Sequence, residues 1–238
     1  MLRFLDIFFS FFGMLFLSPL LIFIYVISLT EGNDPLFVQE RLGKEKRPSK
    51  LIKFRTMKPN TESIASHLIS KDQITTFGKF LRSSKIDELP QLWNVFKGEM
   101  SFVGPRPNVL AETKLYTDEE KKLLSVRPGI TDFASIVFSD EGDILDGSND
   151  PDLDYNQLIR PWKSRLGIFY IENKSILLDI KLIFTTALAI VSKRKALEIV
   201  VKILITKKAD NLLIRICKRK NSLKPYHPPG SNSIVVNR

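Results

Sequence analysis

The chain of 238 residues, 44% of them hydrophobic, is long enough for one domain with appended segments. Its formal net charge of +10 indicates an anionic partner, which can be nucleic acid, a membrane surface or a phosphorylated substrate. The single cysteine, Cys217, excludes a disulfide within the chain, and the two histidines, His67 and His227, stand too far apart in sequence to suggest a zinc site.

The first predicted element is an apolar helix near the start of the chain. Residues 7–29 carry no charged side chain, and an apolar stretch of about 18 or more residues is typical of a membrane helix. A signal peptide is the competing interpretation, but neither a marked basic start nor a small-residue cleavage site accompanies the stretch. Ser18-Pro19 predicts a kink in its middle, because proline lacks an amide hydrogen and crowds the preceding turn.

The charges that flank this helix bear on its topology. Arg3 precedes it and the stretch 41–58 after it is strongly basic, whereas lysine and arginine favour the cytoplasmic side of a membrane. A helix that enters the membrane, bends at Ser18-Pro19 and leaves on the same face agrees with basic flanks on both sides. An ordinary spanning helix that tolerates its proline is the alternative.

Two short strands are expected after the membrane segment. A turn-forming cluster at 30–35 marks its end, and 36–39 follow as a strand. Residues 51–57 alternate between polar and apolar side chains, so Lys53 and Arg55 share one face if this segment is extended. These two cations could meet an anionic substrate, although a solvated strand face explains them as well.

The central run from Lys85 to Pro107 carries the strongest chemical signal in the sequence. Asp87 and Glu88 stand just before Pro90, and proline is favoured in a first helical turn, so both carboxylates are expected at a helix N-terminus. The helix dipole stabilises ionised carboxylates there, by about 0.3–1 kcal/mol when they are exposed. One carboxylate can then attack phosphorus while the other orients it or shuttles a proton. The plainer alternative is that Asp87 only caps the helix, which ends at Gly98.

Basic side chains surround these carboxylates in sequence. Arg106 lies between two prolines, which lowers the entropy lost when its guanidinium is presented to a phosphate. Arg82 and Lys85 lie just upstream and are expected to meet the same phosphates. A plain surface turn is the alternative for the arginine. A diphosphate would repel a carboxylate nucleophile, so we expect Mg²⁺ or Mn²⁺ at Asp87.

Further helices are expected on both sides of the central run. Residues 75–84 are predicted as a helix, and Thr117 with Glu120 three residues later forms a capping-box pattern. Residues 130–154 are acidic and loop-like, whereas 155–171 are helical with an interruption near their proline.

The last part of the chain is predicted to hold an interfacial helix and a basic tail. Residues 175–192 are apolar but too short and too charged to span a membrane, which favours a helix at the membrane surface. From residue 193 onward the chain is basic, and its proline-rich end suggests disorder. The expected domains are a membrane helix at 1–30, a cytoplasmic catalytic domain at 31–192 and a basic tail at 193–238.

Several short runs along the chain share one family resemblance. They are the apolar segment with Ser18-Pro19, Lys53-Phe54-Arg55-Thr56-Met57, Asp87-Glu88-Leu89-Pro90-Gln91-Leu92-Trp93-Asn94, Gly104-Pro105-Arg106-Pro107, Arg127-Pro128-Gly129-Ile130-Thr131, and Tyr170 followed by Asn173, Ser175 and Asp179. On these runs the chain, from about Arg3 to Ser192, resembles the bacterial sugar transferase family, the monotopic phosphoglycosyl transferases, which are polyprenyl-phosphate sugar-1-phosphate transferases.

The resemblance implies an α+β, mainly helical, monotopic membrane protein with a re-entrant N-terminal helix and a small β element. It also implies a catalytic domain on the cytoplasmic face of the bacterial inner membrane. The implied reaction moves a sugar-1-phosphate from a UDP-sugar to undecaprenyl phosphate and releases UMP, as the first membrane step of a surface glycan or glycoprotein pathway.

The resemblance also assigns roles to residues. Asp87 would be the nucleophile and the metal ligand, through a covalent aspartyl sugar-phosphate, and Glu88 would be the second catalytic carboxylate. The expected substrate-binding cations are Lys53, Arg55, Arg82, Lys85, Arg106 and Arg127.

The chain departs from the family pattern in two places. Many members have Gly-Trp and then Gly-Arg where this chain continues with Asp132-Phe133-Ala134-Ser135. Many members also carry an acid three residues before the tyrosine, where this chain has Gly167. Asp140, Glu141 or Asp143 could supply a replacement acid.

Two other functions compete with this interpretation. The net charge favours a nucleic-acid-binding protein, but the sequence lacks an RRM, zinc or helix-turn-helix signature and begins with an apolar helix. A non-catalytic membrane scaffold would tolerate the loss of Asp87. The expected partners are a UDP-sugar, undecaprenyl phosphate and membrane lipids rather than nucleic acid, with a homo-oligomer left open.

Overall fold

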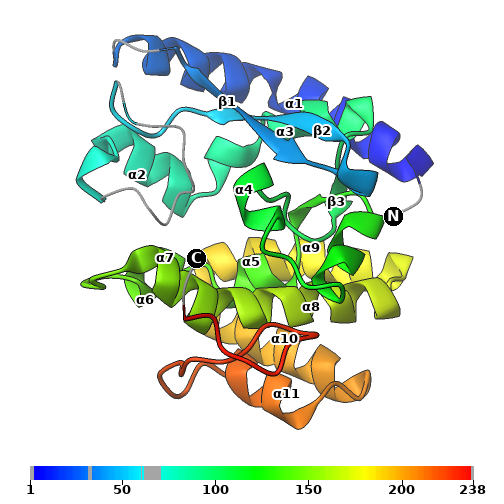
Figure 1. Cartoon of the computed structure of the whole chain (residues 1–238). Helices are drawn as coiled ribbons and strands as arrows, with labels where there is room; N and C mark the ends of the chain where they lie inside the picture. Colours follow the sequence, from blue (N-terminus) through cyan, green and yellow to red (C-terminus); the bar gives the residue numbers. More distant parts are fainter. Residues whose placement is uncertain (1–2, 32–33, 60, 62–70, 237–238) are drawn as a thin grey trace.

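The computed structural model describes residues 3–31, 34–59, 61 and 71–236 (Figure 1). The protein is mainly helical with two small sheets, which confirms the expected α+β class. The α-helices are α1 (Arg3–Leu29), α2 (Thr76–Ser83), α3 (Gln91–Lys97), α4 (Leu110–Thr113), α5 (Phe133–Val137), α6 (Glu141–Ile144), α7 (Pro151–Asp154), α8 (Arg160–Asn173), α9 (Ile176–Val191), α10 (Lys193–Thr206) and α11 (Asn211–Cys217). The shorter helical turns are η1 (Lys44–Lys46), η3 (Lys71–Gln73), η4 (Ile86–Glu88), η5 (Glu120–Ser125) and the π-helical η6 (Tyr155–Ile159).

Four short strands form two separate pairs. They are β1 (Leu36–Leu42), β2 (Pro48–Phe54), β3 (Ser101–Val103) and β4 (Gly129–Thr131). β1 and β2 form an antiparallel hairpin, and β3 pairs with β4 in parallel. The second strand was predicted at 51–57, but β2 begins earlier, at Pro48. The Gly43 amide bonds to the Arg47 carbonyl at 2.8 Å, and this turn reverses the chain just before Pro48.

The start of α1 is tied to the first half of the protein by polar contacts. The Arg3 guanidinium donates hydrogen bonds to the backbone carbonyls of Val95 and Phe96 in α3. The buried Asp6 carboxylate accepts a hydrogen bond from the Ser101 hydroxyl of β3 at 3.0 Å. These contacts fix the charged end of an otherwise apolar helix.

The far end of α1 is attached by apolar packing. Ile24, only 3% exposed, lies in a buried cluster with Phe54 of β2 and Leu81 of α2. The helix therefore touches the same body at both ends, and it runs along the hairpin and α3 (Figure 1).

α1 continues through Pro19 as one helix. In an unbroken helix the Leu15 carbonyl would accept from the amide of residue 19, which proline lacks. The Ser18 hydroxyl donates to that carbonyl instead, at 2.7 Å. Within the described residues, α1 is the helix that is long and apolar enough to cross a membrane by length and composition.

The second half of the chain shares one hydrophobic core. Its fully buried side chains include Phe133 and Ile136 of α5, Leu182 of α9 and Leu204 of α10. Residues 130–154, which we predicted to be loop-like, therefore contain β4 and three short helices, because the apolar face of α5 closes this core.

The C-terminal residues pack against α8. We call residues 221–236 the C-terminal strap. Tyr226 of the strap stacks on Trp162 of α8, with ring centroids 4.6 Å apart. We expected a basic tail from residue 193 with a disordered end. The structure instead has α10, α11 and this strap there. α10 contacts α9, and both α11 and the strap contact α8.

Candidate functional site

A cavity of about 310 Å³ lies where the hairpin and α2 meet the helices of the second half. We call it the central pocket. Six of the residues predicted from the sequence line it together: Lys53, Arg82, Lys85, Asp87, Glu88 and Arg106. Cations and carboxylates from distant parts of the chain therefore converge on one cavity.

Local sequence places the two carboxylates. Lys85 adopts a left-handed backbone conformation (φ 59°) that ends the α2 region, and η4 follows directly with Asp87 and Glu88. Pro90 then directly precedes α3 as its N-cap, one position before the first helical turn in which the sequence placed it. The pair thus lies in a tight turn between two helices.

A glycine holds α2 close to this turn. A Cβ on Gly78 would lie 2.1 Å from the backbone oxygen of Thr56, so α2 packs directly on the chain that follows β2. The same contact lets Arg82 Nε donate to the Thr56 hydroxyl at 2.8 Å. Thr75 caps the helix by accepting from the Gly78 amide at 2.9 Å, in agreement with the predicted start.

Glu88 and Arg106 form an ion pair at the pocket wall. Burial alone would raise the pKa of Glu88, but the adjacent guanidinium outweighs burial and lowers it. The carboxylate in turn raises the pKa of Arg106. Because Arg106 holds Glu88 ionised, Glu88 fits the orienting role better than the proton-shuttle role, and the sequence had left both open.

Asp87 has a different environment. Its side chain is 5% exposed, and its Oδ1 atom has no hydrogen-bond partner among the residues that the structure describes. Burial, followed by repulsion from Glu88, raises the pKa of Asp87 to about 6. The expected stabilisation of its ionised form by a helix N-terminus is therefore outweighed by burial.

The neighbouring cations compensate for this clustering of acids. Lys53 lies in the pocket, and burial together with repulsion from Arg82 and Arg106 lowers its pKa to about 8. Burial also lowers the pKa of Arg82, although Asp87 and Glu88 favour its charge. The positive charges of these side chains therefore suit the pocket to bind an anionic group.

Two predicted cations lie elsewhere. Arg55 shares a face with Lys53, as the alternation predicts, since both cations lie over the Phe37 ring, but its Nε donates to the Asp34 carbonyl at 2.8 Å. Arg127 Nε donates to the Gly98 carbonyl at 3.0 Å and lines a second hollow of about 360 Å³. The structure therefore does not bring Arg55 or Arg127 to the central pocket.

Other lining residues were missed because packing, rather than a local motif, brings them in. They are Asn108, Tyr116, Asp132, Ser135, Tyr155, Arg160 and Lys163. Asp132 could have been found, since Asp132 and Ser135 form a capping box at the start of α5. Burial raises the pKa of Asp132.

The departures from the family pattern have structural counterparts. A Cβ on Gly167 would lie 2.6 Å from Leu123 Cδ2, so Leu123 occupies the space that a side chain there would need. Of the suggested replacement acids, Glu141 lines the pocket and pairs with Lys163. Asp140 instead pairs with Lys193 at 2.6 Å, away from the pocket lining.

Fold and site together define a class of protein. It is an α+β protein with a candidate membrane helix, and its pocket places the buried Asp87 carboxylate among cations, as suits chemistry at phosphorus. The bacterial sugar transferase model matches residues 1–193, and the chain belongs to that family.

Three curated relatives illustrate the match. The galactosyl transferase CpsE of Streptococcus agalactiae is 34% identical over 77% of this chain and 40% of its own length. The UDP-glucose:undecaprenyl-phosphate glucose-1-phosphate transferase of Klebsiella pneumoniae is 35% identical over 76% and 38%. The uncharacterized sugar transferase EpsL of Bacillus subtilis is 36% identical over 68% and 73%. The chain spans about 40% of the length of the first relatives that it matches.

Proposed function

We propose that this protein transfers a sugar-1-phosphate from a UDP-sugar to undecaprenyl phosphate, giving undecaprenyl-diphosphate-sugar and UMP. The observation that carries the proposal is the buried Asp87, which lines the central pocket together with Lys53, Arg82 and Arg106. Relatives named as undecaprenyl-phosphate galactose and glucose-1-phosphate transferases support the same reaction. The direct test is to incubate membrane fractions with a panel of UDP-sugars and measure UMP release.

The proposed chemistry has two displacements at one phosphorus atom. An oxygen of the Asp87 carboxylate attacks the sugar-bearing phosphorus, and the bond to the bridging oxygen breaks with its electron pair leaving on UMP. The aspartyl sugar-phosphate is then attacked by a phosphate oxygen of undecaprenyl phosphate, which restores the carboxylate. No net proton transfer is needed when both phosphates react as anions.

The remaining pocket residues support these steps. Arg106, oriented by Glu88, and the cations Lys53 and Arg82 neutralise charge on the diphosphate and on the departing UMP. Glu88 therefore acts mainly through Arg106 in this scheme.

The residues also fit a divalent cation. Mg²⁺ binds through one or two carboxylates plus phosphate oxygens, and the Oδ1 of Asp87 is a buried carboxylate oxygen without a hydrogen-bond partner in the described part of the chain. Asp87 would hold the ion, which when bound neutralises diphosphate charge.

Chelation is expected to stop UMP release. Excess EDTA should remove activity, because the Asp87 carboxylate would then face an unscreened diphosphate, and added Mg²⁺ or Mn²⁺ should restore it. UMP release is measured before EDTA, after EDTA and after readdition. Full activity in excess EDTA would remove the cation from the proposal.

The alkaline side of the pH profile is expected to follow Lys53. Its pKa is lowered to about 8, so the ammonium loses its charge as pH rises through that value. We expect kcat/KM for the UDP-sugar to fall above about pH 8, since this ratio reports groups of the free enzyme. Lys53→Arg keeps its charge and should move this limb to higher pH, whereas an unchanged limb would exclude Lys53 as its source.

We propose that α1 is re-entrant and that the protein lies on the cytoplasmic face of the bacterial inner membrane. At 1.5 Å per residue α1 is about 40 Å long, enough to cross a hydrocarbon core of about 30 Å. Arg3 and Asp6 at one end and Ile24 near the other nevertheless contact the same body. Exposed apolar side chains on α9, among them Leu177 and Phe184, offer a second membrane contact.

Cysteine labelling tests this topology. In a Cys217→Ser background, Leu2→Cys and Lys44→Cys are both expected to react only with a reagent that reaches the cytoplasm, because α1 returns to the face it enters. Labelling is measured on intact cells and on opened membranes with an impermeant maleimide. Reaction of the cysteine at position 2 from outside would show a true span.

A further inference from the structure

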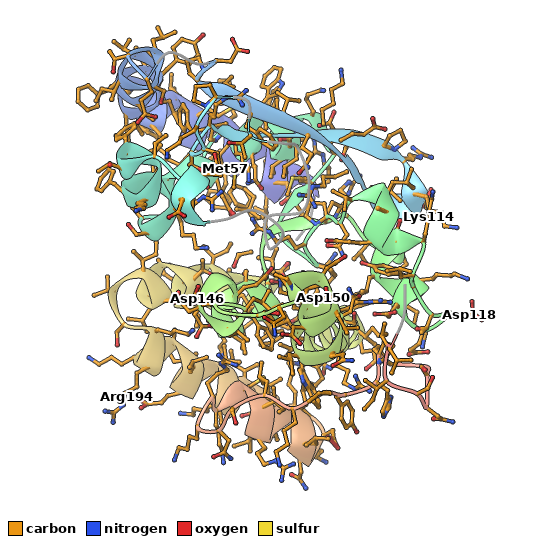
Figure 2. All side chains as sticks on the ribbon, turned by 60° about the vertical axis from the view of Figure 1, so that its left-hand side comes forward. Met57, Lys114, Asp118, Asp146, Asp150 and Arg194 are labelled. Atoms are coloured by element: carbon orange, nitrogen blue, oxygen red, sulfur yellow. The ribbon has the colours of Figure 1, made fainter. Side chains whose placement is uncertain are left out.

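The C-terminal strap lies outside the residues that the family model matches, which end at 193. It nevertheless contacts two segments that line the central pocket. Figure 2 shows it beside the turn that carries Asp118, below α8. Its contacts therefore bear on a site formed by the family-matched part of the chain.

The first contact repairs a gap in the helix ladder. In a regular α-helix the Gln157 carbonyl would accept from the amide of residue 161, but residue 161 is a proline and has no amide hydrogen. The Tyr226 amide of the strap donates to this carbonyl at 3.0 Å. The Gln157 side chain returns a bond to the Val235 carbonyl at 2.7 Å, so the strap holds Gln157 twice.

This gap lies in the π-helical turn η6. The Arg160 amide bonds to the Tyr155 carbonyl, five residues back, which widens the turn. Both Tyr155 and Arg160 line the central pocket. The wider turn sets the positions of the Tyr155 and Arg160 side chains. The strap hydrogen-bonds to Gln157, which lies at the centre of this turn.

Aromatic stacking strengthens the same contact. The Tyr226 ring lies on Trp162, which is 2% exposed, at an interplanar angle of 24°. The Arg165 guanidinium lies 4.9 Å from the Tyr226 ring centroid and donates to the His227 carbonyl at 2.9 Å. This packing keeps the Tyr226 amide aligned with its acceptor.

The strap also contacts the segment that holds Tyr116 and Leu123, two further residues of the pocket lining. The strap turns at Gly230, whose φ of 76° suits glycine, and the preceding Pro229 carbonyl accepts from the Thr117 hydroxyl at 2.5 Å. That hydroxyl also accepts from the Glu120 amide at 3.1 Å, which completes the predicted capping box. Glu120 in turn binds Arg160 of the pocket wall at 3.0 Å.

We propose that the strap is part of the framework of the active site, and that Tyr226 and Gln157 are positioning residues that hold Tyr155 and Arg160 against the bound nucleotide sugar. The expected effect of the strap on substrate binding rests on the proposed function, whereas its expected effect on the structure of η6 does not. Because Asp87 is held separately by η4, the strap should affect substrate binding more than the chemical step.

Three substitutions at one position separate the contacts. Tyr226→Phe keeps the ring and the amide, Tyr226→Ala keeps only the amide, and Tyr226→Pro removes both ring and donor. Hydrogen exchange of residues 153–163 in the full-length protein in detergent should be unchanged for Phe, faster for Ala and fastest for Pro. Loss of the backbone bond should add about a fivefold increase in exchange. In a Trp93→Phe background, the Trp162 fluorescence should shift to the red for Ala and Pro but not for Phe.

The kinetic arm uses the same variants. In Tyr226→Pro, KM for the UDP-sugar should rise about fivefold or more, whereas kcat should change less than about twofold. Tyr226→Phe should have the same kinetic constants as the parent. The proposal fails if exchange at 153–163 is the same in Pro and parent, or if it rises equally in α3 and α5. If the parent releases no UMP from any UDP-sugar, the proposed function fails, while exchange and fluorescence still decide the role of the strap.

Discussion

Replacing Asp87 with asparagine is expected to abolish sugar-phosphate transfer, lowering kcat by about 10⁴-fold or more. An amide cannot attack phosphorus, and the neighbouring Glu88 is occupied by its ion pair with Arg106. The protein should remain folded, because asparagine has nearly the same size and removes a buried charge that Glu88 repels. UMP release and thermal unfolding in detergent measure the two effects.

Mass spectrometry of the intact protein and of its peptides tests the covalent step directly. Parent enzyme with a UDP-sugar and no lipid acceptor should gain the mass of one sugar phosphate on a peptide that contains Asp87, and the Asp87→Asn variant should not. Asp118→Asn is the matched control, since the Asp118 side chain is 97% exposed, and it should behave as the parent. Transfer that persists in Asp87→Asn would favour the non-catalytic scaffold instead.

Replacing Arg160 with methionine is expected to destabilise the protein by about 3–5 kcal/mol. The Arg160 and Glu120 side chains are 7% and 0% exposed, and the carboxylate also accepts from the Ser164 hydroxyl at 2.7 Å. Removing the guanidinium would leave a buried carboxylate without its countercharge. Denaturant unfolding of variants in the Trp93→Phe background, followed by Trp162 fluorescence, measures the loss.

Arg194→Met provides the comparison. Arg194 and Glu198 form an ion pair with side chains 90% and 64% exposed, and the Arg194 label in Figure 2 lies at the edge of the molecule. Its loss should cost less than about 1 kcal/mol because water screens the pair. Adding Glu120→Gln to Arg160→Met should restore part of the stability. Equal losses for Arg160→Met and Arg194→Met would contradict the assigned burial of this pair.

The parts of the fold that were predicted are those that short stretches of sequence determine. Pro90 and Gly98 bound α3, and Thr75 starts α2, through dihedral and capping preferences that act within a few residues. The carboxylate pair lies close to Pro90 in sequence, so it could be located without knowledge of the rest of the protein.

The parts that were not predicted depend on packing between distant segments. Tyr155 and Lys163 reach the pocket because α8 packs on α5, and no spacing within their own segment signals this. The raised pKa of Asp87 likewise results from burial, which a sequence motif does not reveal. The proline-rich end of the chain was interpreted as disordered from its composition, although Pro228 and Pro229 are buried in the structure.

The two helix prolines differ in when their repair can occur during synthesis. Ser18 emerges from the ribosome beside Pro19, so the Leu15 carbonyl is satisfied as soon as α1 forms. Tyr226 is made well after Gln157, because α8 to α11 lie between them in the chain, so the Gln157 carbonyl meets this donor only after those helices have been synthesised. The repair in α1 is thus local and immediate, whereas the pocket wall is completed only after α8 to α11 and the strap have left the ribosome.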